Sequence, residues 1–126
     1  MNAITDGKPV YIQVKEWIEN RIIKGVWKTG DQLPSLRELS AEFRINQNTI
    51  VRTYEAIVHD GTAYSVRGMG YYVSDCALES ILQRRRREFY NSTLPRFLNQ
   101  ISALGIDPIE IANDYLLKLK DNESKP

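Results

Sequence analysis

The sequence predicts a mainly α-helical fold that carries one small β-hairpin. Apolar residues recur every three or four positions along most of the chain, which is the spacing of an amphipathic helix. Between residues 61 and 74 this spacing gives way to two short runs rich in Tyr and Val around a glycine turn, which is typical of a hairpin. With 126 residues, the chain has room for one domain, or for a small domain with an appendage.

Three helices are expected before residue 60. The first starts at Pro9, a residue favoured at a first helical position, and ends at Gly25, which suits the position just after a helix. The second starts at a capping box formed by Ser35 and Glu38, in which each side chain bonds a backbone N–H of the other residue. Asn46 is a good N-cap for the third helix.

The second and third helices are joined by a tight turn and form a helix-turn-helix. The third helix opens with Gln47, Asn48 and Thr49, and Arg52 lies on its exposed side. A second helix that begins with amides, a hydroxyl and an arginine is typical of helix-turn-helix motifs that contact DNA bases. With the hairpin added as a wing, residues 1–75 are predicted to form a winged helix-turn-helix DNA-binding domain.

Residues 76–126 are predicted to form a short C-terminal helical dimerisation segment. Pro95 interrupts a helical pattern, so a bend or break is expected within Tyr90 to Pro95. A last helix is expected after Asp107, with Pro108 at its first position. The apolar stripe of this segment is larger than one short appendage can hide from water, which favours a homodimer. The residues expected at the dimer interface are Leu78, Ile81, Leu82, Phe89, Phe97, Ile101 and Leu116.

Two features of this segment have alternative interpretations. Its aromatic residues fit either a ligand cleft between subunits or a dimer core, and their helical spacing favours the core. These residues are Phe89, Tyr90, Phe97 and Tyr115. The basic run Arg84–Arg87 suggests nucleic-acid binding, but four consecutive residues point in four directions around a helix. A solvated linker helix, or pairing with Glu79 and Glu88 across a dimer, is the favoured interpretation of this run.

Composition and charge exclude several classes of function. The formal net charge is only +1, so nucleic-acid binding must come from local placement of charge. Arg44–Tyr54 contains two arginines and no acid, and Gly61–Ser74 contains Arg67 and no acid. Cys76 is the only cysteine and His59 the only histidine, so neither a disulfide, a metal site nor a cofactor is expected. No nucleophile–base constellation indicates an enzyme. Without a signal peptide or an apolar stretch of about 20 residues, the protein is expected to be cytoplasmic.

Several stretches together resemble the GntR family of bacterial transcription regulators. They match its pattern almost continuously over residues 9–73, in order and at the right spacing. The stretches are Pro9–Gln13, Gly25–Trp27, Gly30–Leu39, Asn46–Tyr54 and Arg67–Val73. The short helical tail is similar to the small YtrA-type branch of the family, whose C-terminal part serves dimerisation and which lacks the large effector domains. Gln47 and Thr53 depart from the family pattern, where proline and alanine are frequent, and these departures bear on which operator is recognised.

The resemblance implies DNA contacts around the second helix. Arg37, which follows the Pro-Ser pair, is expected to contact a base or a phosphate, with a surface pair to Glu38 as the alternative. Ser35 is expected to cap its helix, and its backbone N–H is also a candidate for a phosphate contact. Tyr11 is expected either to hydrogen-bond a phosphate, as the family suggests, or to pack at the helix edge.

The third helix is expected to enter the major groove with its first turn. Gln47 and Asn48 suit adenine, and Thr49 suits a thymine methyl or a phosphate. Capping is the rival role for Asn48 and Thr49. Arg52, farther along the exposed side, is expected to bind phosphate, with an ion pair to Glu55 as the alternative.

The wing is expected to touch DNA through its turn. Gly68 and Gly70 allow a tight turn and a close approach to a minor groove, and Arg67 supplies positive charge beside them. A plain hairpin turn needs the same glycines, so only the combination with Arg67 and the preceding motif favours a DNA contact.

The sequence thus favours a homodimeric, sequence-specific DNA-binding transcription regulator, most simply a repressor. Its expected partners are double-stranded DNA and a second copy of the chain, and an effector of unknown identity is left open. Two third helices related by a two-fold axis would contact a palindromic operator whose half-sites are about 10 bp apart. The alternative is a winged-helix protein-interaction module without DNA binding, which predicts no salt-dependent affinity for DNA.

Overall fold

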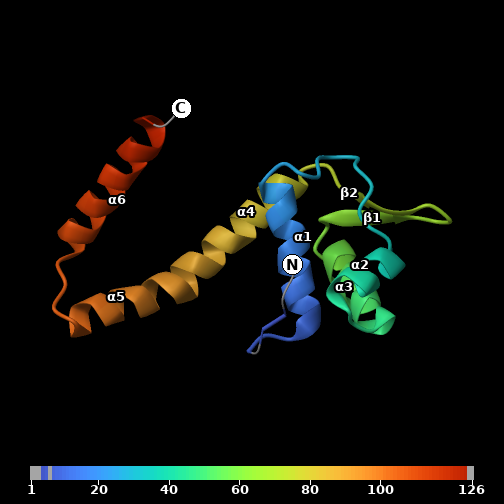
Figure 1. Ribbon diagram of the computed structural model, residues 1–126, viewed down its shortest axis with the longest axis horizontal. Coiled ribbons are helices and arrows are strands. Elements are labelled where there is room, and N and C mark those ends of the chain that lie inside the picture. The colour runs from blue at the N-terminus through green and yellow to red at the C-terminus, as the bar shows by residue number, and fades with distance from the viewer. Residues whose placement is uncertain (1–3, 6, 125–126) are drawn as a thin grey trace. The chain divides into compact units, whose positions relative to one another are not determined.

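The computed structural model describes residues 4–5 and 7–124, and the chain forms two compact units that divide between Arg84 and Arg85 (Figure 1). The predicted fold class is confirmed, since the described residues are mostly helical and contain one two-stranded hairpin. The boundary predicted after residue 75, between a DNA-binding domain and a dimerisation segment, concerns function and not compactness, and it stays a prediction.

Three helices open the first unit, as predicted: α1 (Val10–Ile23), α2 (Leu36–Phe43) and α3 (Gln47–His59). The predicted capping box is present, since the Glu38 N–H donates to Ser35 Oγ at 3.0 Å and the Ser35 N–H donates to Glu38 Oε1 at 3.2 Å. The Asn48 N–H donates to Asn46 Oδ1 at 2.7 Å, which confirms Asn46 as the N-cap of α3. Between α2 and α3, Arg44 adopts a left-handed backbone conformation with a φ of 55°, and this turns the chain sharply.

The core of the first unit draws side chains from α1, α2, α3, the hairpin and the start of α4 (Ala77–Glu88). Trp17 packs edge-on against Trp27 and Phe43, with ring centroids 5.7 and 5.1 Å apart. Because burying one aliphatic side chain contributes about 1.5–3 kcal/mol, this cluster is what holds the three helices together. Its buried members are Val14, Ile18, Ile22, Leu33, Leu39, Phe43, Ile50, Tyr54, Ile57, Ala63, Val73, Ala77 and Ile81.

The predicted hairpin consists of β1 (Ala63–Val66) and β2 (Gly70–Val73), paired antiparallel. The loop before α2 adds a third extended segment that the sequence did not indicate. Gln32 bridges to Tyr72, and beside it the Leu33 N–H donates to the Tyr71 carbonyl at 2.8 Å. The wing is therefore anchored on the helix-turn-helix by backbone hydrogen bonds.

The irregularity predicted near Pro95 is a widened helical turn, not a break. α4 leads through the π-helical turn η1 (Phe89–Thr93) into α5 (Leu94–Ala103). The residues at both junctions, Glu88 and Thr93, have helical backbone angles (φ −61°, ψ −41° and φ −67°, ψ −47°). Pro95 lacks an N–H, and its ring would collide with the carbonyl four residues earlier in a regular helix. A π-helical turn relieves this collision without ending the helix.

Burial and pairing within one chain bear on three expectations about α4 and α5. Ile81 is fully buried in the core of the first unit, so it has no exposed area to bury against a second subunit, contrary to its predicted place at a dimer interface. Ile101 of α5 is likewise buried within one chain. Arg84 is not part of a solvated run, because it pairs inside the first unit with the carboxylate of the buried Glu19.

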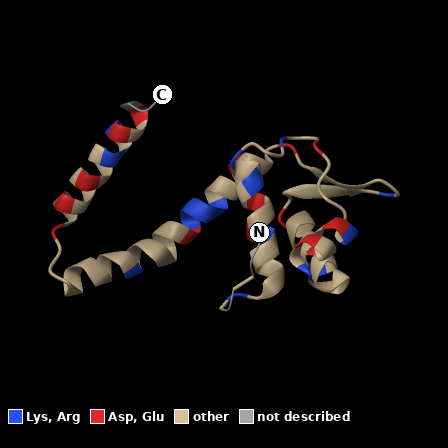
Figure 2. Ribbon diagram, in the orientation of Figure 1, with Lys and Arg blue, Asp and Glu red and all other residues tan. Residues whose placement is uncertain are grey.

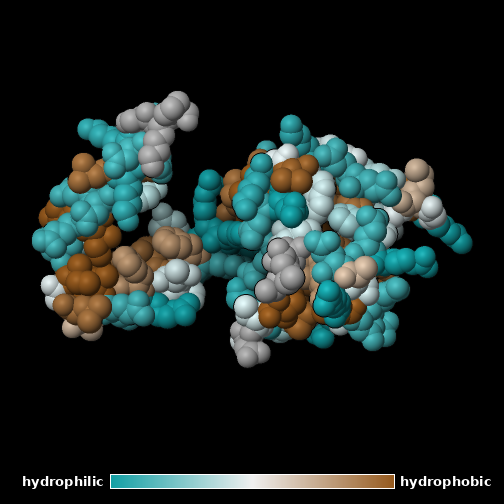
Figure 3. Space-filling model, in the orientation of Figure 1, coloured by the Kyte–Doolittle hydropathy of each residue, from teal (hydrophilic) through white to brown (hydrophobic). Residues whose placement is uncertain are grey.

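The second unit ends with α6 (Pro108–Ser124), which starts where it was predicted. The Ile109 N–H donates to Asp107 Oδ1 at 2.9 Å, so Asp107 caps the helix. Large apolar side chains of α5 and α6 face water, including Phe97 and Leu116, and Figure 3 shows hydrophobic residues gathered over these helices. Over the ranges that the structure describes, every helix is too short or too polar to cross a bilayer.

Tyr54 of α3 joins the helices to the wing. Its ring is fully buried and stacks on Tyr71 of β2, with centroids 4.1 Å apart and planes at 10°. Its hydroxyl donates to the Pro34 carbonyl, immediately before the Ser35 cap of α2. Burial raises the pKa of the Tyr54 hydroxyl, and the nearby Tyr71 and Glu38 raise it further.

Tyr54→Phe should lower the free energy of unfolding by about 1–2 kcal/mol, because it leaves the Pro34 carbonyl without its donor while keeping the ring. Urea titration measures this loss. Tyr90→Phe is the matched control, since Tyr90 is 63% exposed, and should change stability by less than about 0.5 kcal/mol.

The same pair of variants tests the raised pKa of Tyr54. Because the fold favours the protonated phenol, its contribution is fully present below the unfolded-state pKa of about 10 and is lost as pH rises toward the folded-state value. Above pH 10 the wild type should therefore lose stability faster than Tyr54→Phe, by at most about 1.4 kcal/mol per pH unit. Equal slopes for the two proteins would contradict the burial of this hydroxyl.

Candidate nucleic-acid interface

The first turn of α3 presents polar side chains to solvent. Gln47 and Asn48 are exposed and Thr49 is half-buried. Because Asn46 caps the helix, the side chain of Asn48 is not needed for capping, which was its rival role. Behind this turn, Ile50 is fully buried and fixes the orientation of the helix. The amides therefore stand on a rigid support and can approach base edges.

Arg52 is held over Tyr11 of α1. The guanidinium carbon lies 4.1 Å from the centre of the Tyr11 ring, which is a cation–π contact. Among the described residues, Arg52 forms no ion pair with Glu55, the alternative expected from the sequence. The contact brings a positive charge and a phenol together from two helices, and both groups can bind a phosphate oxygen.

Thr53 connects the same two helices, a structural role that the sequence pattern did not predict. Its buried hydroxyl lies 3.1 Å from the Tyr11 carbonyl and 3.1 Å from the Thr49 carbonyl, so it bonds the start of α1 to α3. The sequence signal for this role was a hydroxyl on the buried side of α3, at a position where alanine is frequent in the family that the chain resembles. Because Thr53 holds Tyr11 in place, it also supports the position of Arg52.

Arg37 lies in the first turn of α2 and is exposed. The carboxylate of its neighbour Glu38 accepts a hydrogen bond from the Ser35 N–H, and no ion pair joins Glu38 to Arg37 among the described residues. The guanidinium is thus available to a ligand. The phosphate contact expected from the Ser35 N–H is not available, because Glu38 already accepts from that group. The Ser35 hydroxyl accepts the Glu38 N–H and still has its own proton to donate.

The tip of the wing is basic and tightly turned. Figure 2 shows positive charge at the end of the hairpin, where Arg67 is exposed. Gly68 and Gly70 have φ values of 78° and 115°, which residues with a side chain adopt only rarely. Gln32 donates its Nε2 to the Met69 carbonyl at 2.7 Å and fixes the tip from outside the hairpin. Gln32 is thus a second supporting residue that the sequence reasoning missed.

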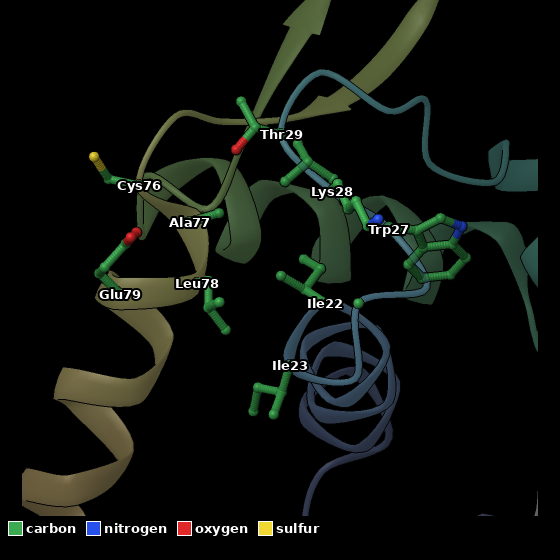
Figure 4. A pocket seen from close by; sticks show the side chains of 11 residues that line it. Ile22, Ile23, Trp27, Lys28, Thr29, Cys76, Ala77, Leu78 and Glu79 are labelled. Atoms are coloured by element: carbon green, nitrogen blue, oxygen red, sulfur yellow. The ribbon is translucent and has the colours of Figure 1, made fainter.

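A hollow of about 300 Å³ lies elsewhere on the first unit (Figure 4). Ile22, Ile23 and Trp27 line it from the end of α1 and the following loop, and Cys76 and Leu78 line it from the start of α4. Its lining is mainly apolar and its volume is at the lower end for small-molecule sites. Cys76 is an exposed free thiol.

Comparison with known proteins places these features in a family. Residues 10–73 match the model of "Bacterial regulatory proteins, gntR family". The chain is 30% identical over 110 residues to the uncharacterized HTH-type transcriptional regulator YhcF of Bacillus subtilis, covering 87% of this chain and 89% of that protein. It is 33% identical over 75 residues to the HTH-type transcriptional repressor YtrA of Bacillus subtilis, covering 60% of this chain and 58% of that protein.

Solved structures give the same result. A GntR family transcriptional regulator from Listeria monocytogenes superposes with a TM-score of 0.71 at 29% identity, covering 91% of this chain and 98% of that chain. AraR(DBD) in complex with operator ORX1 superposes with a TM-score of 0.56 at 30% identity, covering 59% of this chain and 96% of that chain. The predicted winged helix-turn-helix is thereby confirmed.

Gly70→Ala should lower the free energy of unfolding by about 1–3 kcal/mol. The reason is twofold: the φ of 115° is strained for alanine, and the added Cβ would lie 3.3 Å from Gln32 Nε2 and press on its bond to Met69. Gly68→Ala is the control, because its φ is 78° but nothing lies within 4 Å of the added carbon, and it should cost about 1 kcal/mol. Urea unfolding and amide exchange of the hairpin measure both, and a Gly70→Ala protein as stable as the wild type would contradict the tight packing of Gln32.

Proposed function

The chain belongs to the GntR family of bacterial regulatory proteins, and from this premise we propose that it is a homodimeric transcriptional repressor that binds a palindromic operator. The observation that carries the proposal is the first turn of α3, where Gln47 and Asn48 are exposed on a helix whose opposite side is buried in the core. The stretch Arg44–Tyr54 around them contains no acid, so no carboxylate of this stretch would repel a phosphate.

The side chains around α3 suit the parts of a DNA duplex that they would meet. Gln47 and Asn48 can each bridge N6 and N7 of an adenine in the major groove, and Thr49 can contact a thymine methyl. Arg37 can bind a guanine edge or a phosphate from the first turn of α2. Arg52 needs no further ordering to bind a phosphate, because the Tyr11 ring already restrains its guanidinium.

The wing would add a contact beside the major groove. Arg67 supplies the charge, and Gly68 and Gly70 keep side-chain bulk away from the duplex at the turn. A related solved structure, AraR(DBD), holds an operator, and its likeness extends over 59% of this chain. This relative supports DNA as the partner of this surface.

Dimerisation would pair two such surfaces. The second unit exposes large apolar side chains in η1, α5 and α6, and single soluble chains rarely leave so many together in water. A second copy of the same segment is the economical partner, because a two-fold axis presents one apolar face to its equal. The interface we propose includes Leu78, Leu82, Phe89, Phe97 and Leu116.

A two-fold dimer would contact a palindrome whose half-sites lie about 10 bp apart. Repression is the simplest outcome of such binding, since a bound dimer blocks a promoter. The name of YtrA, a repressor to which this chain is 33% identical over 75 residues, supports this assignment. A protein-interaction module without DNA binding remains the second candidate, and the net charge of +1 is the observation that favours it.

Arg37→Ala combined with Arg52→Ala should weaken operator binding at least about a hundredfold, because each arginine contact is worth about 1–3 kcal/mol and occurs twice in a dimer. A mobility-shift assay with a palindrome selected from random DNA measures this, and the affinity of the wild type should fall steeply with salt. Arg86→Ala with Arg87→Ala is the matched control, since both arginines are exposed and lie outside the helix-turn-helix. Equal binding by the wild type and the Arg37/Arg52 variant would rule out the proposed face, and a wild type without salt-dependent affinity would favour the interaction module.

Phe97→Asp should convert the dimer to monomers at micromolar concentration, because it places a carboxylate on an apolar face that the partner would cover. Phe97 is 41% exposed in one chain, so the monomer should keep its stability. Sedimentation velocity measures the change in mass. Val26→Asp is the control, as Val26 is 50% exposed on the first unit, and it should leave the dimer intact. A Phe97→Asp protein that still sediments as a dimer would remove α5 from the interface.

A further inference from the structure

An ion pair with one fully buried partner connects α1, α4 and the end of α3 in the first unit. Glu19 of α1 is 1% exposed, and its carboxylate contacts the guanidinium of Arg84 on α4. The same guanidinium lies 4.0 Å from Asp60 Oδ2, and Asp60 directly follows α3 as its C-cap. Lys15 of α1 lies 2.5 Å from the same Asp60 oxygen. One guanidinium on α4 therefore meets a buried acid of α1 and the acid that follows α3.

Arg84 lies on the buried face of α4, at the end of the first unit. Ala77, Ile81 and Arg84 follow one another at helical spacing, so they lie on one face of α4, and the first two are buried in the core. Arg84 is the last residue of the first unit. Beyond it the helical backbone continues through η1 into α5, whose exposed apolar residues we assign to the dimer interface.

Stability alone gives a poor reason for this ion pair. Burial of the Glu19 carboxylate costs about as much as its attraction to Arg84, whose side chain is 26% exposed, returns, and apolar replacements of such pairs are often neutral or stabilising. The geometry of the pair is more informative. A guanidinium is a planar fork that bonds carboxylates in fixed directions, whereas apolar contacts such as those of Ala77 and Ile81 allow a helix to slide and rotate.

We propose that Arg84 is a positioning residue for operator recognition: its ion pair with Glu19 and Asp60 fixes the direction in which α4 leaves the DNA-binding unit, and thereby the half-site spacing that the dimer accepts. This inference rests on the proposed function, since it requires a dimer that binds two half-sites. Arg84 itself does not touch DNA in this scheme. The effect of Arg84 on DNA binding appears only when the DNA-binding units of both subunits must engage one duplex.

The test compares two properties of each variant: its affinity for a duplex with one half-site, and its affinities for palindromes whose half-site spacing is varied one base pair at a time. The variant is Glu19→Leu with Arg84→Met, which replaces both partners of the ion pair by apolar groups, so that neither charge is left facing the other's empty place, while Asp60 keeps Lys15. Arg87→Met is the matched control, because Arg87 is an exposed arginine of the same helix.

The wild type and Arg87→Met should prefer one spacing strongly. The double variant should keep its dimeric mass by sedimentation velocity, and its half-site affinity should stay within about twofold of the wild type. Its preference for the best spacing over the next should fall about tenfold or more. When the two DNA-binding units of the dimer are loosely oriented, binding of the second one loses part of the 10²–10⁴-fold gain of bivalent binding. A folded double variant that keeps the wild-type spacing preference would overturn the inference.

Two further outcomes are informative. If the double variant does not fold by circular dichroism, Arg84→Lys takes its place, since it keeps the charge next to Glu19 but loses the planar fork; a reduced spacing preference supports the inference and an unchanged one overturns it. A wild type that binds half-sites and palindromes but accepts all spacings equally overturns this inference alone. A wild type without affinity for any DNA sinks the proposed function as well.

Discussion

The structure depends on one constraint: α3 must be buried along one side and stay in water at its first turn. Ile50, Tyr54 and Ile57 are fully buried, while Gln47 and Asn48 at the start of the same helix are exposed. α1 supplies the opposite wall of the core. The loop before α2 accepts the Tyr54 hydroxyl and pairs with β2, so the wing takes its place from the same side chain that fixes α3. A loss of this packing would displace the helix and the wing together.

The local features of the fold were predictable because they depend on residues that are close together in the sequence. The Ser35 capping box, the Asn46 cap and the Asp107 cap each involve residues two or three positions apart, and all three are present. The partners that position the site lie much farther apart in the chain. Gln32 and Met69 are separated by 37 positions, Thr53 and Tyr11 by 42, and Arg84 and Glu19 by 65. No periodicity or spacing within one helix identifies such partners, so the exposed residues of the candidate site were predictable and the residues that support them were not.

Helical spacing also fails to tell burial within one chain from burial between two chains. Ile81 and Leu78 belong to the same apolar pattern in α4, yet Ile81 is fully buried in the core while Leu78 is 40% exposed. The difference comes from which face of α4 meets the first unit, and that depends on the core contact of Ala77 and the ion pair of Arg84. A stripe of apolar residues therefore predicts that a face is covered, and the fold decides whether the same chain covers it.

The near-neutral charge of the chain is compatible with a DNA-binding surface because several of its acids are used internally. Glu38 serves in the α2 capping box, Asp60 pairs with Lys15, and Glu19 pairs with Arg84. These acids fix helix ends and helix contacts, so their negative charge is offset close to where it stands. Arg37, Arg52 and Arg67, in contrast, carry no ion pair among the described residues, and Arg52 rests on a neutral ring. Phosphate attraction falls off within about 8–10 Å at physiological salt, so a cation beside a bound phosphate counts for more than the net charge summed over all 126 residues.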